Sequence, residues 1–303
     1  MSKENTAVTK KKIKRCKEDV VFDAACFIIL TLVLFVVAYP LYWVIISSIS
    51  APSAVSSGKV LLHPIGFTLK GYAEVFKNDQ VMRGFLNSLI ITFCGVMVNL
   101  IVTLPTSYAL SRSNFSGKKP ITIFFGGGLI PTYLVIQRLQ MLNTIWALIL
   151  PGCLSVYNMI VARTFFKSNI SEELYEAAEI DGCTQARFFF QIALPLSKAI
   201  IAILVLYYGV GHWNSYFSAL VYISDKAKYP LQLVLRNILI TNQTALSQTA
   251  TTAAARAALQ EKQQLIDVMK YSLIIISSIP VLVMYPLVQK HFVKGVMIGS
   301  MKG

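Results

Sequence analysis

Residues 172–195 read EELYEAAEIDGCTQARFFFQIALP, a mixed-charge segment between two apolar blocks. Ser171, directly before it, is predicted to cap a helix by accepting hydrogen bonds from free backbone N–H groups, and the glutamates that follow suit the positive end of the helix. Asp181-Gly182 is expected to end this helix, because glycine tolerates the left-handed conformation of a C-cap. A second short helix is expected from about Thr184 to Ile192, stopping at Leu194-Pro195. The segment therefore predicts a helix–glycine–helix elbow.

The acidic and apolar side chains of the first elbow helix are predicted to lie on different sides. The acidic set is Glu173, Glu176 and Glu179, and the apolar set is Leu174, Ala177 and Ala178. The apolar side is narrow enough to enter a groove on a partner protein. An amphipathic helix lying on a membrane surface, or a solvated turn, is the alternative that this pattern leaves open.

Composition places the chain among membrane proteins. Of its 303 residues 55% are hydrophobic and 14% charged, with a mean hydropathy of +0.61, whereas soluble domains carry about 25% charged residues. The net charge of +14 lies beside apolar runs, where lysine and arginine set orientation and meet anionic lipid. We therefore expect membrane lipid, and no nucleic acid, as the partner of these charges.

Long apolar runs separated by charged loops predict an all-α, polytopic membrane protein with six transmembrane helices. The expected spans are 21–46, 87–110, 121–139, 145–166, 199–220 and 271–287. The expected organisation is a basic N-terminal arm (1–20), a first span with its outer loop (21–86), a transmembrane domain (87–290) that contains the elbow (171–195), and a tail (291–303). Since the inner loops carry the denser lysine and arginine, both termini and the elbow are predicted to be cytoplasmic in a multi-pass protein of the cell membrane.

The elbow resembles the EAA loop of bacterial ABC importer permeases. Glu176-Ala177-Ala178, Asp181-Gly182 and Ile192-x-Leu194-Pro195 match that motif in residue type and spacing. Ser107–Arg112 resembles the family's end-of-span signature, and Gly127–Arg138 resembles a branch associated with complex oligosaccharides. The nearest resemblance is to the smaller permease subunit of maltose-type systems and to the polysaccharide and oligosaccharide group.

This resemblance implies a type I ABC importer transmembrane domain, a transport subunit for carbohydrate and not an enzyme. It implies a second homologous permease, two nucleotide-binding ATPase subunits and an extracellular sugar-binding protein as partners. No Walker loop is present, so ATP-Mg is expected on the partner ATPase, with no cofactor bound by this chain. The residues implied in ATPase coupling are Glu176, Ala177, Ala178, Asp181, Gly182, Leu194 and Pro195, with Lys302 and Gly303 of the tail as further contacts.

A polar and aromatic cluster in the fifth span is a candidate lining of the transport pathway. It comprises Trp213, Asn214, Tyr216 and Phe217, and Tyr133 and Gln137 of the third span are added to it. Helical spacing is expected to put Trp213, Tyr216 and Phe217 on one side. Aromatic faces stack on sugar rings, and amides match sugar hydroxyls. Helix packing with an interfacial aromatic belt is the alternative.

The same residues argue against other function classes. An ion-coupled secondary transporter would need carboxylates inside the membrane, and the expected spans contain only Asp23, at the boundary of the first. A membrane-embedded enzyme would need a nucleophile and base or a metal cluster, which three scattered histidines and five unpaired cysteines do not supply. An ABC importer for a non-sugar solute stays open.

Overall fold

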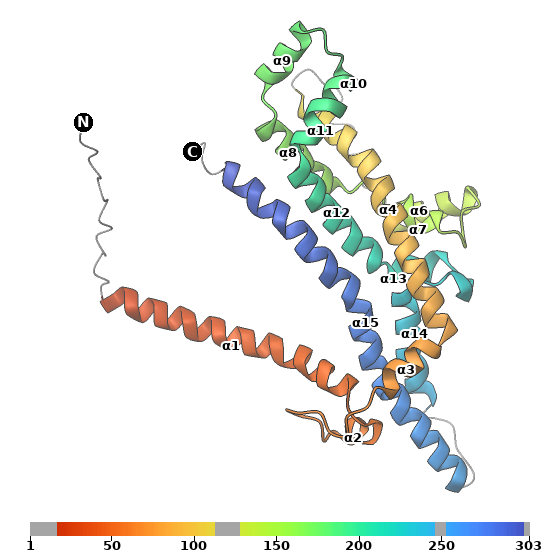
Figure 1. The fold of residues 1–303 in the computed structure, drawn as a ribbon. Coiled ribbons are helices and arrows are strands. Elements are labelled where there is room, and N and C mark those ends of the chain that lie inside the picture. The colour runs from red at the N-terminus through yellow and green to blue at the C-terminus, as the bar shows by residue number, and fades with distance from the viewer. Residues whose placement is uncertain (1–16, 113–127, 246–252, 300–303) are drawn as a thin grey trace.

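The computed structural model describes residues 17–112, 128–245 and 253–299, and these are helical with connecting loops (Figure 1). The helices outside the elbow are α1 (Lys17–Ser48), α2 (Pro52–Ser56), α3 (Lys70–Lys77), α4 (Asp79–Ser111), α6 (Leu129–Arg138), α7 (Trp146–Ile149), α8 (Val156–Asn169), α12 (Lys198–Trp213), α13 (Tyr216–Tyr222), the 3-10 turn η2 (Lys226–Lys228), α14 (Leu231–Ala245) and α15 (Ala253–Gly299). The all-α expectation is confirmed.

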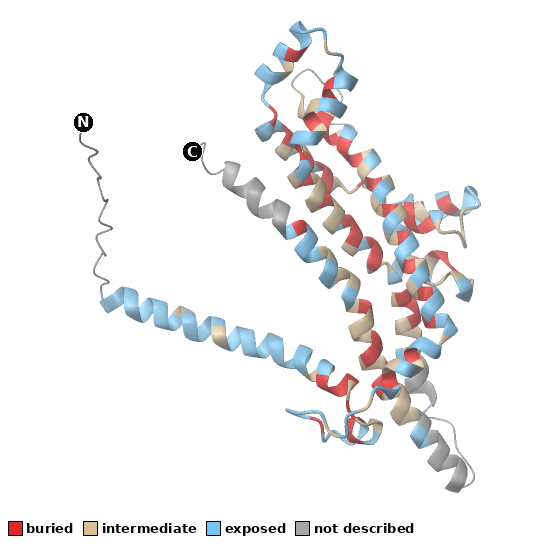
Figure 2. Cartoon of the chain, in the orientation of Figure 1, coloured by how far each residue is buried: buried red, intermediate tan, exposed pale blue. Residues whose placement is uncertain are grey.

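The bundle is organised around α4, which packs against α8, α12 and α14, while α15 packs on α12. The buried residues of the bundle lie mainly on α4, α8, α12 and α15 (Figure 2). The helix of the second span begins at Asp79 and not near Asn87, because Asn78 caps it: the side-chain oxygen of Asn78 accepts from the backbone N–H groups of Gln80 and Val81.

Two of the expected spans are broken helices. The prediction of one helix over 145–166 is wrong: α7 ends at Ile149, and α8 starts at Val156 with Ser155 as its cap. The prediction of one helix over 199–220 is also wrong, since α12 ends at Trp213 and α13 begins at Tyr216. The sequences at these breaks, Pro151-Gly152 and Asn214-Ser215, are turn formers that a hydropathy pattern does not register.

Three described helices are long and apolar enough to cross a membrane: α1, α4 and the Gln263–Gln289 part of α15. A fourth span results if the pair Gln185–Leu196 and Lys198–Trp213, which is bent by 80°, is taken as one. Of the expected third span only the part after residue 127 is described, and it holds the short helix α6. Residues 121–127 of that span, and the basic arm 1–16, lie outside the described residues.

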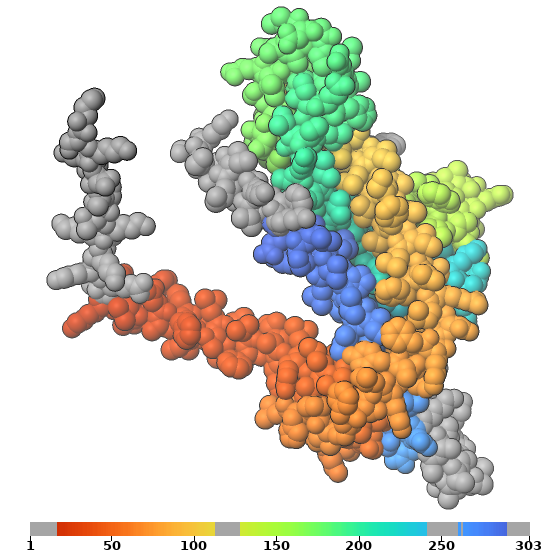
Figure 3. Space-filling model, viewed as in Figure 1, coloured from red at the N-terminus to blue at the C-terminus, as the bar shows by residue number. Residues whose placement is uncertain are grey.

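The first helix leaves the bundle and extends away from it (Figures 1 and 3). Its most apolar window has none of its residues buried, and α1 is exposed along most of its length (Figure 2). Only its C-terminal end packs, where Ile46, Ser47 and Ser48 are buried. The apolar surface of α1 is therefore not covered by the described part of this chain.

The break between α7 and α8 is held from within the bundle. Asn99 of α4 donates from Nδ2 to the carbonyl of Gly152 at 2.7 Å, and its Oδ1 lies 2.7 Å from His212 Nε2. Gly95 lets the histidine ring approach, since a Cβ at Gly95 would lie 2.5 Å from Nε2. This network satisfies a carbonyl that the interrupted helix leaves free, which is what lipid would otherwise penalise. Asn99 is therefore a packing residue of the bundle.

Candidate coupling elbow

The elbow is formed by α9 (Glu172–Ile180), α10 (Gln185–Phe188), a π-helical turn η1 (Phe189–Ala193) and α11 (Leu194–Leu196). The cap at Ser171 is confirmed, since its hydroxyl accepts from Leu174 N–H at 3.3 Å. The break at Gly182 is confirmed as well: its φ is +75°, a left-handed conformation that residues with a Cβ rarely adopt. Local sequence thus fixes both ends of α9.

The second half of the elbow differs from its prediction. Thr184 caps it by accepting from Arg187 N–H, but the helix does not stop at Leu194-Pro195. After the π-helical turn, α11 continues the helix through both residues to Leu196, and the bend comes at Ser197, between Leu196 and Lys198. Pro195 can follow in a helix because it lies in the first turn of the segment after the π-helical turn.

The faces of α9 also differ from the predicted division. Ala178 is buried at 9% exposure, and Tyr175 packs beside it against the bundle core. The other residues of α9 are exposed, and among them Glu173, Glu176, Ala177 and Ile180 follow the spacing i, i+3, i+4, i+7 of one helix face. The expectation that Ala178 offers contact surface to a partner is therefore wrong, because its methyl group fills space against this chain's own core.

An aromatic core joins the elbow to the bundle. Phe188 and Phe189 are buried in one cluster with Tyr108 of α4 and Phe166 of α8. The ring of Tyr108 lies 5.0 Å from Phe189 and 5.6 Å from Phe166, centroid to centroid. Ring pairs of this kind add about 0.5–1.5 kcal/mol each beyond their buried area, so they stabilise the attachment of the elbow to α4 and α8.

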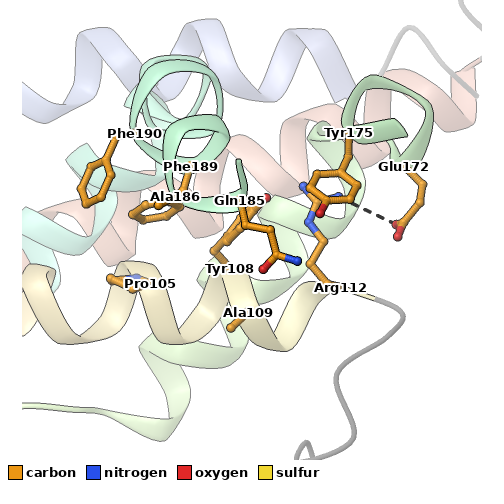
Figure 4. A pocket seen from close by; sticks show the side chains of 10 residues that line it. All are labelled: Pro105, Tyr108, Ala109, Arg112, Glu172, Tyr175, Gln185, Ala186, Phe189 and Phe190. Atoms are coloured by element: carbon orange, nitrogen blue, oxygen red, sulfur yellow. Dashed lines mark ion pairs between the residues drawn. The ribbon is translucent and has the colours of Figure 1, made fainter. Parts of the chain in front are cut away.

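Arg112, the residue that follows α4, lies among three rings, of which Figure 4 shows those of Tyr108 and Tyr175. Its guanidinium carbon is 4.7 Å from the ring centroid of Tyr108, 4.9 Å from that of Tyr175 and 5.5 Å from that of Phe188. Glu172 lies beyond, with an oxygen 3.9 Å from Nη1. Arg112 Nε and Nη2 are buried without an acceptor within the described structure. The rings, more than hydrogen bonds, therefore hold this cation, and they come from α4, α9 and α10.

A cavity of about 410 Å³ lies beside this arginine, between the end of α4 and the elbow (Figure 4). Pro105 and Ala109 form its α4 side, while Gln185, Ala186 and Phe190 come from the elbow. The elbow therefore contacts the end of α4 through the aromatic rings and the Arg112 guanidinium, and the cavity lies next to these contacts.

Known proteins match almost the whole chain in sequence. Protein LplC of Bacillus subtilis (strain 168) is 38% identical over 289 residues, which cover 93% of this chain and 95% of LplC. The polygalacturonan/rhamnogalacturonan transport system permease protein YtcP of the same organism is 35% identical over 288 residues, covering 93% of this chain and 98% of YtcP. The chain belongs to the permease subunits of carbohydrate-uptake ABC importers. It matches no protein-family model.

A solved structure supports the same family. The crystal structure of a bacterial ABC transporter involved in the import of the acidic polysaccharide alginate contains a chain that superposes with a TM-score of 0.81. The two chains are 26% identical, and the match covers 92% of this permease and 99% of the other. The present chain is thus a multi-pass transport subunit of the membrane, and importers of this kind work with ATPase and binding-protein partners.

The predicted pathway residues of the permease do not gather at one place. Trp213 is 2% exposed, lies 5.7 Å from the Phe85 ring and donates from Nε1 to the Ser277 carbonyl at 2.9 Å. Tyr216 and Phe217 lie beyond the break and are 45% and 50% exposed. The expectation that all three share one helix side is wrong, because α12 ends between them. Trp213 is a packing residue in this arrangement.

The remaining candidates are scattered as well. Asn214 donates to the Val210 carbonyl of its own helix end. Tyr133 of α6 stacks with Tyr222 at 6.2 Å between centroids, and Gln137 is exposed. Lys302 and Gly303 lie outside the described residues. In the sequence Arg112 is only the last residue of the end-of-span signature, and a boundary arginine gives no sign of the rings around it.

Proposed function

We propose that the outward face of α9 docks on a cytoplasmic ATPase subunit and passes its movement to the membrane bundle. The observation that carries the proposal is Ile180, whose side chain is 87% exposed at the tip of α9, next to the exposed Ala177. An isoleucine held in water by a fixed helix end is costly, and an apolar groove on a partner would remove that cost.

The charges around this apolar tip indicate what the partner surface is like. Glu173 and Glu176 share the outward face, and Asp181 follows directly after Ile180. We therefore expect an apolar cleft with basic side chains at its rim, since opposite charges steer association and exclude wrong partners. ATP and Mg²⁺ would be bound and hydrolysed by that partner, and this permease would hold no cofactor.

We propose a saccharide of several units as the transported solute. Relatives named for polygalacturonan/rhamnogalacturonan and for galactooligosaccharides support it, the second being the permease GanQ of Bacillus subtilis at 28% identity over 293 residues. A non-sugar solute is the competing assignment, and the solute retained by the purified complex separates the two.

Docking of the elbow on a cytoplasmic ATPase also implies an orientation for the permease and positions for its remaining partners. The elbow lies at the end of the bundle where α4 ends and α12 begins (Figure 1), and we infer that this end and both termini are cytoplasmic. An extracellular sugar-binding protein would then meet the opposite end, near α3 and α14. The uncovered apolar surface of α1 supports a second homologous permease beside this one.

The docking proposal is tested by co-purification with Ile180→Arg. This variant should lose the ATPase subunit from the detergent-solubilised complex, because a guanidinium cannot enter an apolar cleft with a basic rim. Leu62→Arg is the matched control, since Leu62 is 68% exposed and lies outside the elbow. An Ile180→Arg complex that kept its ATPase, as Leu62→Arg should, would refute the docking face.

A further inference from the structure

The second half of the elbow lies across the end of the bundle. The segment Gln185–Leu196 is bent by 80° from α12, and α12 packs along α4, which is long and apolar enough to cross a membrane (Figure 1). A segment at that angle to a membrane-crossing helix lies close to the plane of the membrane surface. The exposed Lys198 begins α12, and a lysine at the end of a span marks the level of the lipid head groups. The second half of the elbow is therefore at that level.

The end of α4 reaches the same level. Leu104 of α4 and Ile200, near the start of α12, are buried in one core cluster. The cavity of about 410 Å³ between α4 and the elbow is lined by Pro105 and Ala109, which follow Leu104 along α4. This cavity is therefore expected at the boundary between lipid and water.

The lining of this cavity is charged at one end and apolar at the other. Arg112 and Glu172 lie at one end, and Pro105 and the exposed ring of Phe190 lie at the other (Figure 4). A molecule with a charged head and an apolar tail has the same division, and phospholipids are the molecules of this kind at a membrane surface.

A row of apolar side chains on α4 leads to the apolar end of the cavity. Phe93, Met97 and Ile101 are exposed, and they continue at the same spacing to Pro105 and Ala109. Residues four apart form a ridge along the surface of a helix. A hydrocarbon chain lying beside this ridge would run from the middle of α4 to the cavity, with its head group at the charged end.

The charges at the other end define the head group. Arg112 Nε and Nη2 have no acceptor among the described residues, and Nη1 is 3.9 Å from the Glu172 carboxylate, too far for a hydrogen bond. Guanidinium groups pair well with phosphate, and basic pockets beside membrane spans hold phospholipid head groups. Glu172 at the same end would repel a head group of net negative charge but would attract one that also carries an ammonium group.

We propose that this cavity binds a phospholipid whose head group carries both a phosphate and an ammonium group, as phosphatidylethanolamine does. The phosphate would face Arg112, the ammonium would face Glu172, and an acyl chain would lie beside the apolar row of α4. Assigning this lipid to the cytoplasmic leaflet rests on the orientation proposed above. Inorganic phosphate is another source of the same anion, but it would leave the apolar end of the cavity and the row on α4 unused.

The test is native mass spectrometry of the complete importer, purified in detergent and titrated with dioleoyl phosphatidylethanolamine or dioleoyl phosphatidylglycerol. The wild type should bind phosphatidylethanolamine about tenfold more tightly, the factor for one charge-assisted contact. Glu172→Gln should remove this preference, because an amide neither attracts an ammonium group nor repels an anion by its charge. Glu74→Gln is the matched control, since Glu74 is an ion-paired carboxylate on α3, 3.2 Å from Lys77 Nζ.

A second variant tests the cavity itself. Ala109→Leu should weaken the binding of both lipids about tenfold, because the larger side chain takes up space that the lipid would occupy. Ala227→Leu is the matched control, since Ala227 is an exposed alanine of η2 and lies outside the elbow. The ATPase content of the complex should stay at the wild-type level in each variant.

The outcomes separate this proposal from the docking of the ATPase. An Ala109→Leu complex that bound both lipids like the wild type would refute the cavity as their site. Tighter binding of phosphatidylglycerol by the wild type, or an unchanged preference in Glu172→Gln, would overturn the ammonium group. Displacement of phosphatidylethanolamine by inorganic phosphate would overturn a lipid as the ligand. The ATPase content of Ile180→Arg, read from the same spectra, tests the docking face separately, so either proposal can fail while the other stands.

Discussion

Replacing Arg112 with alanine should loosen the elbow from the bundle. The guanidinium contacts two rings of the elbow, Tyr175 at 4.9 Å and Phe188 at 5.5 Å. The third ring, Tyr108, belongs to α4, the helix that Arg112 directly follows, so this contact does not link the elbow to the bundle. The side chain of Arg112 is 15% exposed, so each elbow ring is worth about 1 kcal/mol, between the values for exposed and desolvated cation–π pairs.

The ion pair with Glu172 adds little to this. Its atoms are 3.9 Å apart, and the Glu172 side chain is 48% exposed, so it contributes at most about 1 kcal/mol. The free energy of opening the elbow should therefore fall by about 2 kcal/mol in Arg112→Ala, roughly a thirtyfold rise in the open population. Arg112→Lys should lie between alanine and wild type, because an ammonium keeps the charge but cannot stack.

Hydrogen–deuterium exchange of the purified complex measures this opening directly. Peptides that cover residues 172–196 should exchange faster in Arg112→Ala, while peptides of α12 stay unchanged. Arg138→Ala provides the control, since Arg138 is an exposed arginine at the end of α6. Unchanged elbow protection in Arg112→Ala would refute the argument, and so would Arg112→Lys behaving like wild type, because the charge alone would then suffice.

Four further substitutions test the elbow and the bundle. Ala178→Leu should destabilise the permease by about 1–3 kcal/mol through overpacking, measured by thermal unfolding in detergent, whereas Ala177→Leu should leave unfolding unchanged and lower ATPase co-purification; equal unfolding temperatures would contradict this assignment of faces. Gly182→Val should cost about 1–2 kcal/mol because the left-handed conformation is strained for valine, with uncoupled ATP hydrolysis as the readout, and full sugar uptake would count against the bend. Trp213→Phe should cost about 1 kcal/mol by losing the bond to the Ser277 carbonyl without changing the solute concentration for half-maximal uptake; a changed concentration would return Trp213 to the pathway.

Much of the elbow could be predicted from sequence because its signals act on neighbouring residues. The Ser171 hydroxyl caps α9 by accepting from the backbone N–H of Leu174, three residues later. Gly182 adopts the left-handed conformation that residues with a Cβ avoid. The long apolar runs likewise predict membrane-spanning helices. A backbone in lipid has no water to bond with, and a helix satisfies its N–H and C=O groups within the same segment. These conclusions need no information from distant parts of the chain.

Side-chain direction and helix continuity were decided only by the tertiary structure. Ala177 and Ala178 are equivalent in sequence, and the packing of α9 on α4 and α8 buries one and exposes the other. The apolar run 145–166 can break at Gly152 because Asn99, far away in sequence, satisfies the freed carbonyl. In the sequence Arg112 looks like a charge at the membrane boundary, and only the fold places the rings of Tyr175 and Phe188 against it. In each case the deciding energy comes from groups distant in sequence, which a local pattern does not contain.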